Sequence, residues 1–133
     1  MAPPHVLLYE PDQDQAGLLL DVFTQEDMAV TTCNSAAELE QALNMEPTAV
    51  VVTNTWDPGS PRELSAAERE GITYLASRTW VIVTSTRPAA DQLAALPGSE
   101  RITFVAKPYD LNGLLAAVER AVTLARRAAD TPA

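Results

Sequence analysis

The residues best suited to chemistry are few, and each stands at or just beyond the end of an apolar run. They are the acids Glu10 and Asp12, the hydroxyl residues Thr53 and Thr84, and the lysine Lys107. Carboxylates bind hard cations such as Mg²⁺, and a lysine ammonium is a compact positive charge that suits an anion. Lys107 is the only lysine among nine basic residues. Brought together, these groups could hold a cation or an anion.

The elements that must position these residues follow from apolar periodicity. Short apolar or β-branched runs predict strands at residues 6–9, 29–33, 49–53, 80–84 and 102–106. Helical patterns lie between and after them: a helix capped by Asp12, one capped by Ser35, one over about 62–77, one over 88–96, and one capped by Asp110 that ends near 127. Residues 35–38 and 65–68 both have the sequence pattern of a capping box.

Alternation of strands with helices predicts the fold class, which is α/β. Strands that are apolar throughout indicate a parallel sheet covered on both faces, and right-handed crossovers then produce a doubly wound sandwich. We expect one domain over residues 1–133, with a core over about 5–127 and frayed termini. Sites in such sheets lie at the carboxyl ends of the strands, which is where the polar residues stand.

Composition excludes several classes of function. Eighteen acidic against nine basic residues give a formal charge of −9, so we expect neither nucleic-acid nor membrane binding. A single cysteine and a single histidine exclude an internal disulfide and any cysteine- or histidine-rich metal site. The N-terminus lacks the basic start and apolar stretch of a secretory signal. We therefore expect a cytoplasmic protein.

The strand-end residues together resemble the receiver domain of bacterial response regulators, over residues 6 to about 122. The motifs that carry the resemblance are Phe-Val-Ala-Lys-Pro-Tyr at 104–109 and Val-Ile-Val-Thr-Ser at 81–85. The resemblance implies a (βα)5, flavodoxin-like fold. It also implies a pocket in which an Asp after strand three takes a phosphoryl group from a phosphohistidine, with Mg²⁺ held by acids after strand one. The Thr84 hydroxyl and Lys107 ammonium would then hold phosphoryl oxygens.

Two positions depart from the family pattern. Pro11 stands where receivers usually carry the second acid, and Thr53 falls at the acceptor position when counted from Pro47. A threonine hydroxyl is not an ionised nucleophile at neutral pH and has no general base beside it here, and it cannot make the acyl phosphate of the family. We therefore predict a degenerate pocket of Glu10, Asp12, Thr53, Thr84 and Lys107, with no catalytic residue, metal or cofactor. Lys107 should pair with Glu10 and with the Thr53 hydroxyl.

Two alternatives remain open at this point. Asp57 precedes Pro61 by the spacing that receivers show between the acceptor and a loop proline. Strand three would then have to continue through Trp56, and Glu10, Asp12 and Asp57 would bind Mg²⁺ for phosphotransfer. The second alternative is a small flavodoxin-like enzyme or ligand-binding domain, although the chain has neither a glycine-rich phosphate loop nor a nucleophile–base pair.

The resemblance also implies how the protein acts. Phe104 occupies the position of the family's switching aromatic. Because no effector domain follows the last helix, we predict a stand-alone, atypical receiver that is not an enzyme. Its output would pass through a protein partner or a second copy, at the surface formed by the fourth helix, the fifth strand and the fifth helix.

Overall fold

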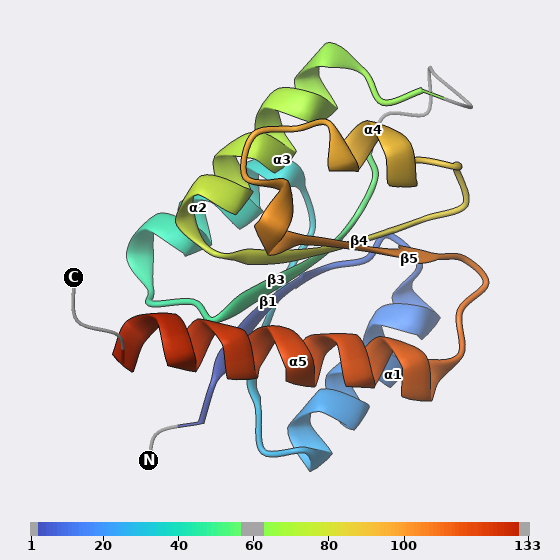
Figure 1. Ribbon diagram of the computed structural model, residues 1–133. Helices are drawn as coiled ribbons and strands as arrows, with labels where there is room; N and C mark the ends of the chain where they lie inside the picture. The colour runs from blue at the N-terminus through green and yellow to red at the C-terminus, as the bar shows by residue number, and fades with distance from the viewer. Residues whose placement is uncertain (1–2, 57–62, 131–133) are drawn as a thin grey trace.

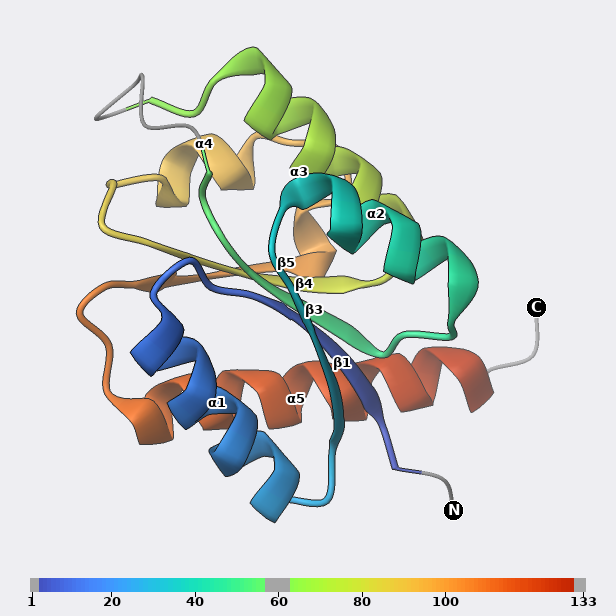
Figure 2. The same cartoon turned by 180° about the vertical axis from the view of Figure 1, so that it is seen from behind.

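Five parallel strands form one sheet in this computed structural model, which describes residues 3–56 and 63–130 (Figures 1 and 2). The strands are β1 His5–Tyr9, β2 Ala29–Cys33, β3 Val50–Asn54, β4 Trp80–Ser85 and β5 Ile102–Ala106. Their order across the sheet is β2-β1-β3-β4-β5. The chain therefore reverses its direction of winding after β2, which is the doubly wound, flavodoxin-like topology expected from the sequence.

Helices cover both faces of this sheet. They are α1 Gln13–Gln25, α2 Ala36–Met45, α3 Ala66–Arg78, α4 Ala90–Ala94 and α5 Leu111–Asp130, and a 3₁₀ turn, η1 Ser99–Arg101, precedes β5. One apolar cluster joins α1 and α5 to the sheet, and a second joins α2, α3 and α4 to its other face.

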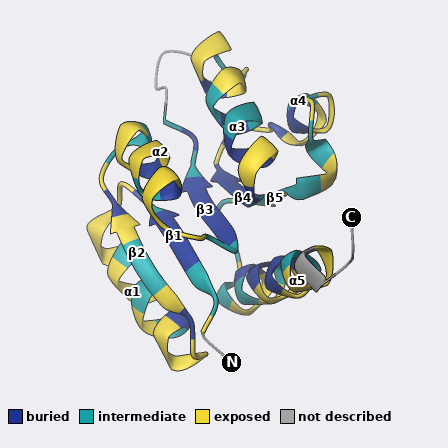
Figure 3. Cartoon of the chain, turned by 90° about the vertical axis from the view of Figure 1, so that its left-hand side faces the viewer, coloured by how far each residue is buried: buried dark blue, intermediate teal, exposed yellow. Residues whose placement is uncertain are grey.

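The two clusters take alternate residues from each central strand. In β3, Val50 and Val52 contact the α1 and α5 side, whereas Val51 contacts the opposite side. All three are fully buried, and Figure 3 shows the central strands as the most buried part of the chain. This explains why the strands read as unbroken apolar runs: a strand covered on both faces has no polar side.

Four predicted helix caps are present. Asp12 Oδ1 accepts the Gln15 N–H (3.1 Å), and Ser35 Oγ accepts the Glu38 N–H (3.1 Å). Ser65 and Glu68 form a complete, reciprocal capping box. The box expected at Ser35 is incomplete, because the Glu38 carboxylate accepts from the Asn34 N–H instead of the Ser35 N–H. Asp110 also caps α5, since its Oδ1 accepts the Asn112 N–H (3.2 Å).

Several predicted boundaries were wrong. Helix α3 begins at Ala66, because the capping box at Ser65 marks its start and not its second turn. Helix α4 spans only Ala90–Ala94, and the 3₁₀ turn that follows begins after Gly98, whose φ of 80° lies in the region that glycine tolerates. Helix α5 continues to Asp130, beyond the predicted end near residue 127. Strand β3 extends one residue further, to Asn54.

Within the described ranges, no helix is both long enough and apolar enough to cross a lipid bilayer.

Burial of the inner face of α5 should contribute strongly to stability. Leu114 is fully buried, so Leu114→Ala should lower the free energy of unfolding by about 2–5 kcal/mol, measured by urea denaturation. The matched control is Leu18→Ala on α1, since Leu18 is 47% exposed. That change should cost less than about 0.5 kcal/mol. Equal effects of the two substitutions would contradict this packing.

Candidate functional site at the strand ends

Parallel pairing places the polar residues at one edge of the sheet. Tyr9 lies beside Thr53, and Asn54 lies beside Thr84. Ser85 lies beside Ala106, so Lys107 follows the end of β5 as Glu10 follows the end of β1. Residues that are far apart in the sequence thus become neighbours because all five strands end on the same side.

Glu10 and Lys107 form a direct ion pair across this edge. Lys107 Nζ lies 2.5 Å from Glu10 Oε1, and the two side chains are 20% and 2% exposed. Glu10 Oε2 accepts the backbone N–H of Asp12 (3.2 Å), and the Lys107 N–H donates to the Ser85 carbonyl oxygen (2.8 Å). Both partners are therefore held by backbone contacts, and the expected pairing of Lys107 with Glu10 is present.

Thr53 makes other contacts than the one expected. It is fully buried, and its hydroxyl donates to the carbonyl oxygen of Asn54 (3.0 Å). Among the described residues it has no hydrogen bond to Lys107, so that part of the expectation was wrong. The Thr84 hydroxyl lies 3.5 Å from the Thr53 carbonyl oxygen. Because the Thr53 side chain is fully buried and its hydroxyl is already hydrogen-bonded to the backbone, it is not presented to an open pocket.

Strand β3 ends at Asn54. The Trp56 N–H then donates to Glu68 Oε2 of α3 (3.0 Å), so the chain has left the strand at this point. The alternative acceptor Asp57 needs a strand that continues through Trp56, and the structure lacks that continuation. Asp57 itself lies outside the described residues.

Asp12 is exposed and caps α1. It also lines a hollow of about 330 Å³ beside Lys107, together with Gln15, Thr86, Pro108 and Tyr109. Gln15 Nε2 donates to the Tyr109 hydroxyl (2.7 Å). Burial raises the pKa of Tyr109 above its ordinary value, and the carboxylates of Glu10 and Asp12 add to this. The phenol therefore stays neutral in the physiological range.

The described residues fit a divalent cation poorly. They contain no group of three or more histidine, cysteine or acidic side chains that could hold a metal ion. Glu10 uses one carboxylate oxygen for Lys107 and the other for a backbone N–H, and Asp12 uses its side chain as a helix cap. Both acids thus have partners that a cation would have to replace.

Phe104 is half-buried and lies beside Val83 in the sheet. It packs against the apolar cluster beneath α2, α3 and α4. Its predicted role as a switch remains a prediction.

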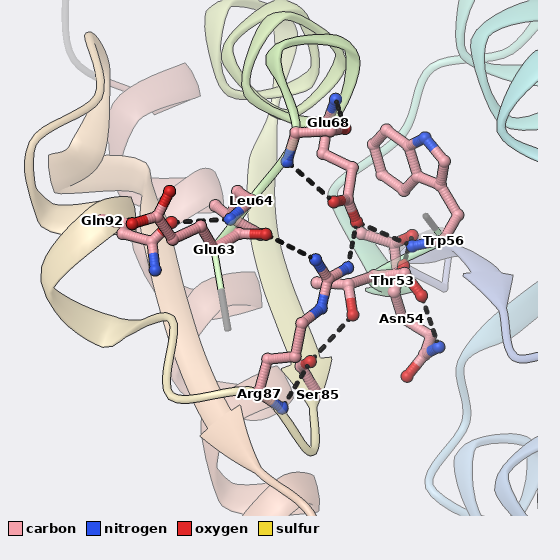
Figure 4. A network of polar contacts seen from close by, with 11 residues as sticks. Thr53, Asn54, Trp56, Glu63, Leu64, Glu68, Ser85, Arg87 and Gln92 are labelled. Atoms are coloured by element: carbon pink, nitrogen blue, oxygen red, sulfur yellow. Dashed lines mark hydrogen bonds and ion pairs between the residues drawn. The ribbon is translucent and has the colours of Figure 1, made fainter. Parts of the chain in front are cut away.

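The sequence reasoning missed a second polar group on the α3 and α4 side. Glu68, Arg87 and Ser85 are all buried and hydrogen-bonded to one another or to neighbouring backbone (Figure 4). The sequence pattern indicates only a capping role for Glu68. One signal could have pointed to the pair: an arginine directly before Pro88, after a strand that is buried on both faces.

Breaking the Glu10–Lys107 pair should destabilise the fold. Lys107→Met leaves an almost fully buried carboxylate without its cation, so it should lower the free energy of unfolding by roughly 2–4 kcal/mol. Adding Glu10→Gln to Lys107→Met should restore part of the loss, as urea denaturation of both variants will measure. Arg120→Met, on the exposed side of α5, is the control and should have little effect. Additive losses in the double variant would show that the two groups do not interact.

Solved structures resemble the chain over almost its whole length, whereas no protein-family model and no curated protein matches its sequence. The signal receiver domain of an HD domain-containing protein from Pseudomonas fluorescens superimposes with a TM-score of 0.78 at 17% identity, covering 99% of this chain and 96% of that one. The orphan response regulator HP1043 of H. pylori gives a TM-score of 0.70 at 18% identity, covering 91% of this chain and 98% of that one. A CheY-like receiver domain protein from Methanospirillum hungatei gives a TM-score of 0.72 at 14% identity, covering 93% of this chain and 98% of that one. The chain therefore has the fold of response-regulator receiver domains.

Proposed function

We propose that this protein is an atypical receiver of two-component signalling, which acts through protein contacts without phosphorylation of an aspartate. The observation that carries the proposal is the state of the strand-end pocket. Thr53 lies one residue before the end of β3 with its hydroxyl bonded to the backbone, and Lys107 is paired with Glu10. The receiver fold is thus retained, while the described pocket residues offer no free carboxylate as a nucleophile beside Lys107.

The proposal of a signalling role draws on the structural neighbours. They are described as a signal receiver domain, an orphan response regulator and a receiver domain protein. Receiver domains generally work by contacting other proteins rather than by turning over a substrate, and we propose the same here. Burial raises the pKa of the Cys33 thiol to about 11, with the Glu38 carboxylate adding to the effect, which argues against a nucleophilic role for this cysteine.

We assign the contact surface to α4, β5 and α5. Strand β5 is at the edge of the sheet, so one side of its backbone is open to a partner. On α4, Ala90, Asp91 and Ala94 are exposed, and small side chains allow close approach of another chain. The occupant would be a protein partner or a second copy.

The absence of aspartate phosphorylation can be tested directly. Incubation with acetyl phosphate and Mg²⁺ should leave the intact mass unchanged, because Thr53 cannot form an acyl phosphate. The same measurement on Asp57→Ala provides the matched comparison. A gain of one phosphoryl group in the wild type that disappears in Asp57→Ala would establish the alternative, a phosphorylatable receiver with Asp57 as acceptor. Circular dichroism of each sample checks that the protein is folded.

The contact surface has its own test. Ala94→Arg places a large charge on α4 and should weaken association at least about tenfold, because a central charge in an interface must be desolvated. Ala37→Arg, at an exposed position of α2 near the opposite edge of the sheet, is the control and should leave association unchanged. Sedimentation velocity over a range of concentrations measures self-association, and cross-linking in cells that produce the tagged chain measures binding to a partner. Equal effects of the two variants would contradict the assignment.

A further inference from the structure

Helix α4 is too short to be stable by itself. It spans five residues, Ala90–Ala94, and has no side-chain cap at its N-terminus. Isolated helices of this length do not persist in water, because the cost of nucleation is not recovered over so few hydrogen bonds. Its place in the fold must therefore come from contacts with other elements.

Helix α4 and the loop before it contact the residues just before α3. Gln92 Oε1 of α4 accepts the backbone N–H of Leu64 (2.6 Å). Leu64 is buried in the same apolar cluster as Ala89 and Leu93. Arg87, in the loop between β4 and α4, donates from one guanidinium nitrogen to the Glu63 carbonyl oxygen (2.9 Å). The loop, α4 and residues 63–65 thus pack as a unit.

The strongest contact in this unit is an ion pair between Arg87 and Glu68 (Figure 4). The Glu68 side chain is fully buried and that of Arg87 is 9% exposed. Glu68 Oε1 accepts the Ser65 N–H (3.1 Å), and Glu68 Oε2 accepts the Trp56 N–H (3.0 Å) in addition to Arg87. One carboxylate therefore joins the segment that follows β3, the start of α3 and the loop before α4.

The loop is held from the strand side as well. The Arg87 N–H donates to Ser85 Oγ (3.0 Å), and Ser85 Oγ lies 2.8 Å from Thr55 Oγ1. The Trp56 ring packs closely on α3, since a Cβ placed on Gly71 would lie 2.9 Å from it. The two charged side chains are themselves almost completely buried, which strengthens their electrostatic attraction.

We propose that the Glu68–Arg87 ion pair fixes the β4–α4 loop and α4 in one arrangement. The carboxylate is a permanent part of α3, so the position of α4 does not require a charged group to be added at the strand ends. Arg87 anchors the loop at one end of α4, and Gln92 anchors the helix itself. The inference rests on the proposed function only where it treats α4 as part of a contact surface.

Hydrogen exchange measured by mass spectrometry can test this local role. In Arg87→Met, amides of residues 87–96 should exchange at least about tenfold faster, because loss of a buried charge partner opens the segment. Amides of β1 and β3 should change much less. Glu68→Gln should have the same pattern, and Arg87→Lys an intermediate one, since lysine keeps the charge but loses the planar fork. Glu70→Gln, an exposed position on the same helix, is the matched control.

A double variant keeps the test valid if a single substitution unfolds the protein. Glu68→Leu with Arg87→Met removes both charges, which buried sites tolerate better than the loss of one. Residues 87–96 should still exchange faster, because the bond from Arg87 to the Glu63 carbonyl oxygen is gone. Acceleration spread equally over α4, β1 and β3, or no acceleration at all, would overturn the proposal: the pair would then serve global stability or nothing measurable.

The two proposals can fail separately. Hydrogen exchange requires no partner, so faster exchange in α4 supports the role of the ion pair even where Ala94→Arg leaves association unchanged. Conversely, loss of association in Ala94→Arg with unchanged exchange in Arg87→Met would retain the contact surface and reject the ion pair as its anchor.

Discussion

Parallel pairing requires every strand to begin at the same end of the sheet and to finish at the other, and the rest of the molecule depends on this constraint. Each strand must be followed by a crossover, so the helices necessarily lie on the two faces. The three central strands β1, β3 and β4 are then buried on both sides, as Figure 3 shows. All loops that follow the strands gather at one edge, which is why residues 97 positions apart, Glu10 and Lys107, can form an ion pair.

The two ion pairs at this end of the sheet have the same pattern of burial. In each, the carboxylate is almost or fully buried, and the cation is the more exposed partner: 2% against 20% for Glu10 and Lys107, and 0% against 9% for Glu68 and Arg87. Long basic side chains can bury their stems while the charged group approaches the surface, whereas a short carboxylate cannot. Removing either cation would leave a carboxylate without compensation, so both pairs constrain the loops that they join.

These constraints bear on how the protein would act. A phosphorylated receiver changes shape when a new charge appears at the strand ends. Here the lysine of the described pocket is already ion-paired with Glu10, and the loop before α4 is attached to a carboxylate that is always present. A surface held in this way suits recognition by a partner without a preceding chemical step, which is the function proposed.

Interactions between residues close in the sequence predicted much of the fold. Apolar runs identified the five strands, and Asp12, Ser35 and Asp110 marked helix starts, because periodicity and capping depend on neighbouring residues only. Glu10 and Lys107 could be paired in advance because the strand-end rule brings them together. The direction of the Thr53 hydroxyl, the end of β3 at Asn54 and the pairing of Glu68 with Arg87 were decided by tertiary structure alone. Each depends on which groups packing leaves without water, and a buried polar group must then bond to whatever partner the fold places beside it.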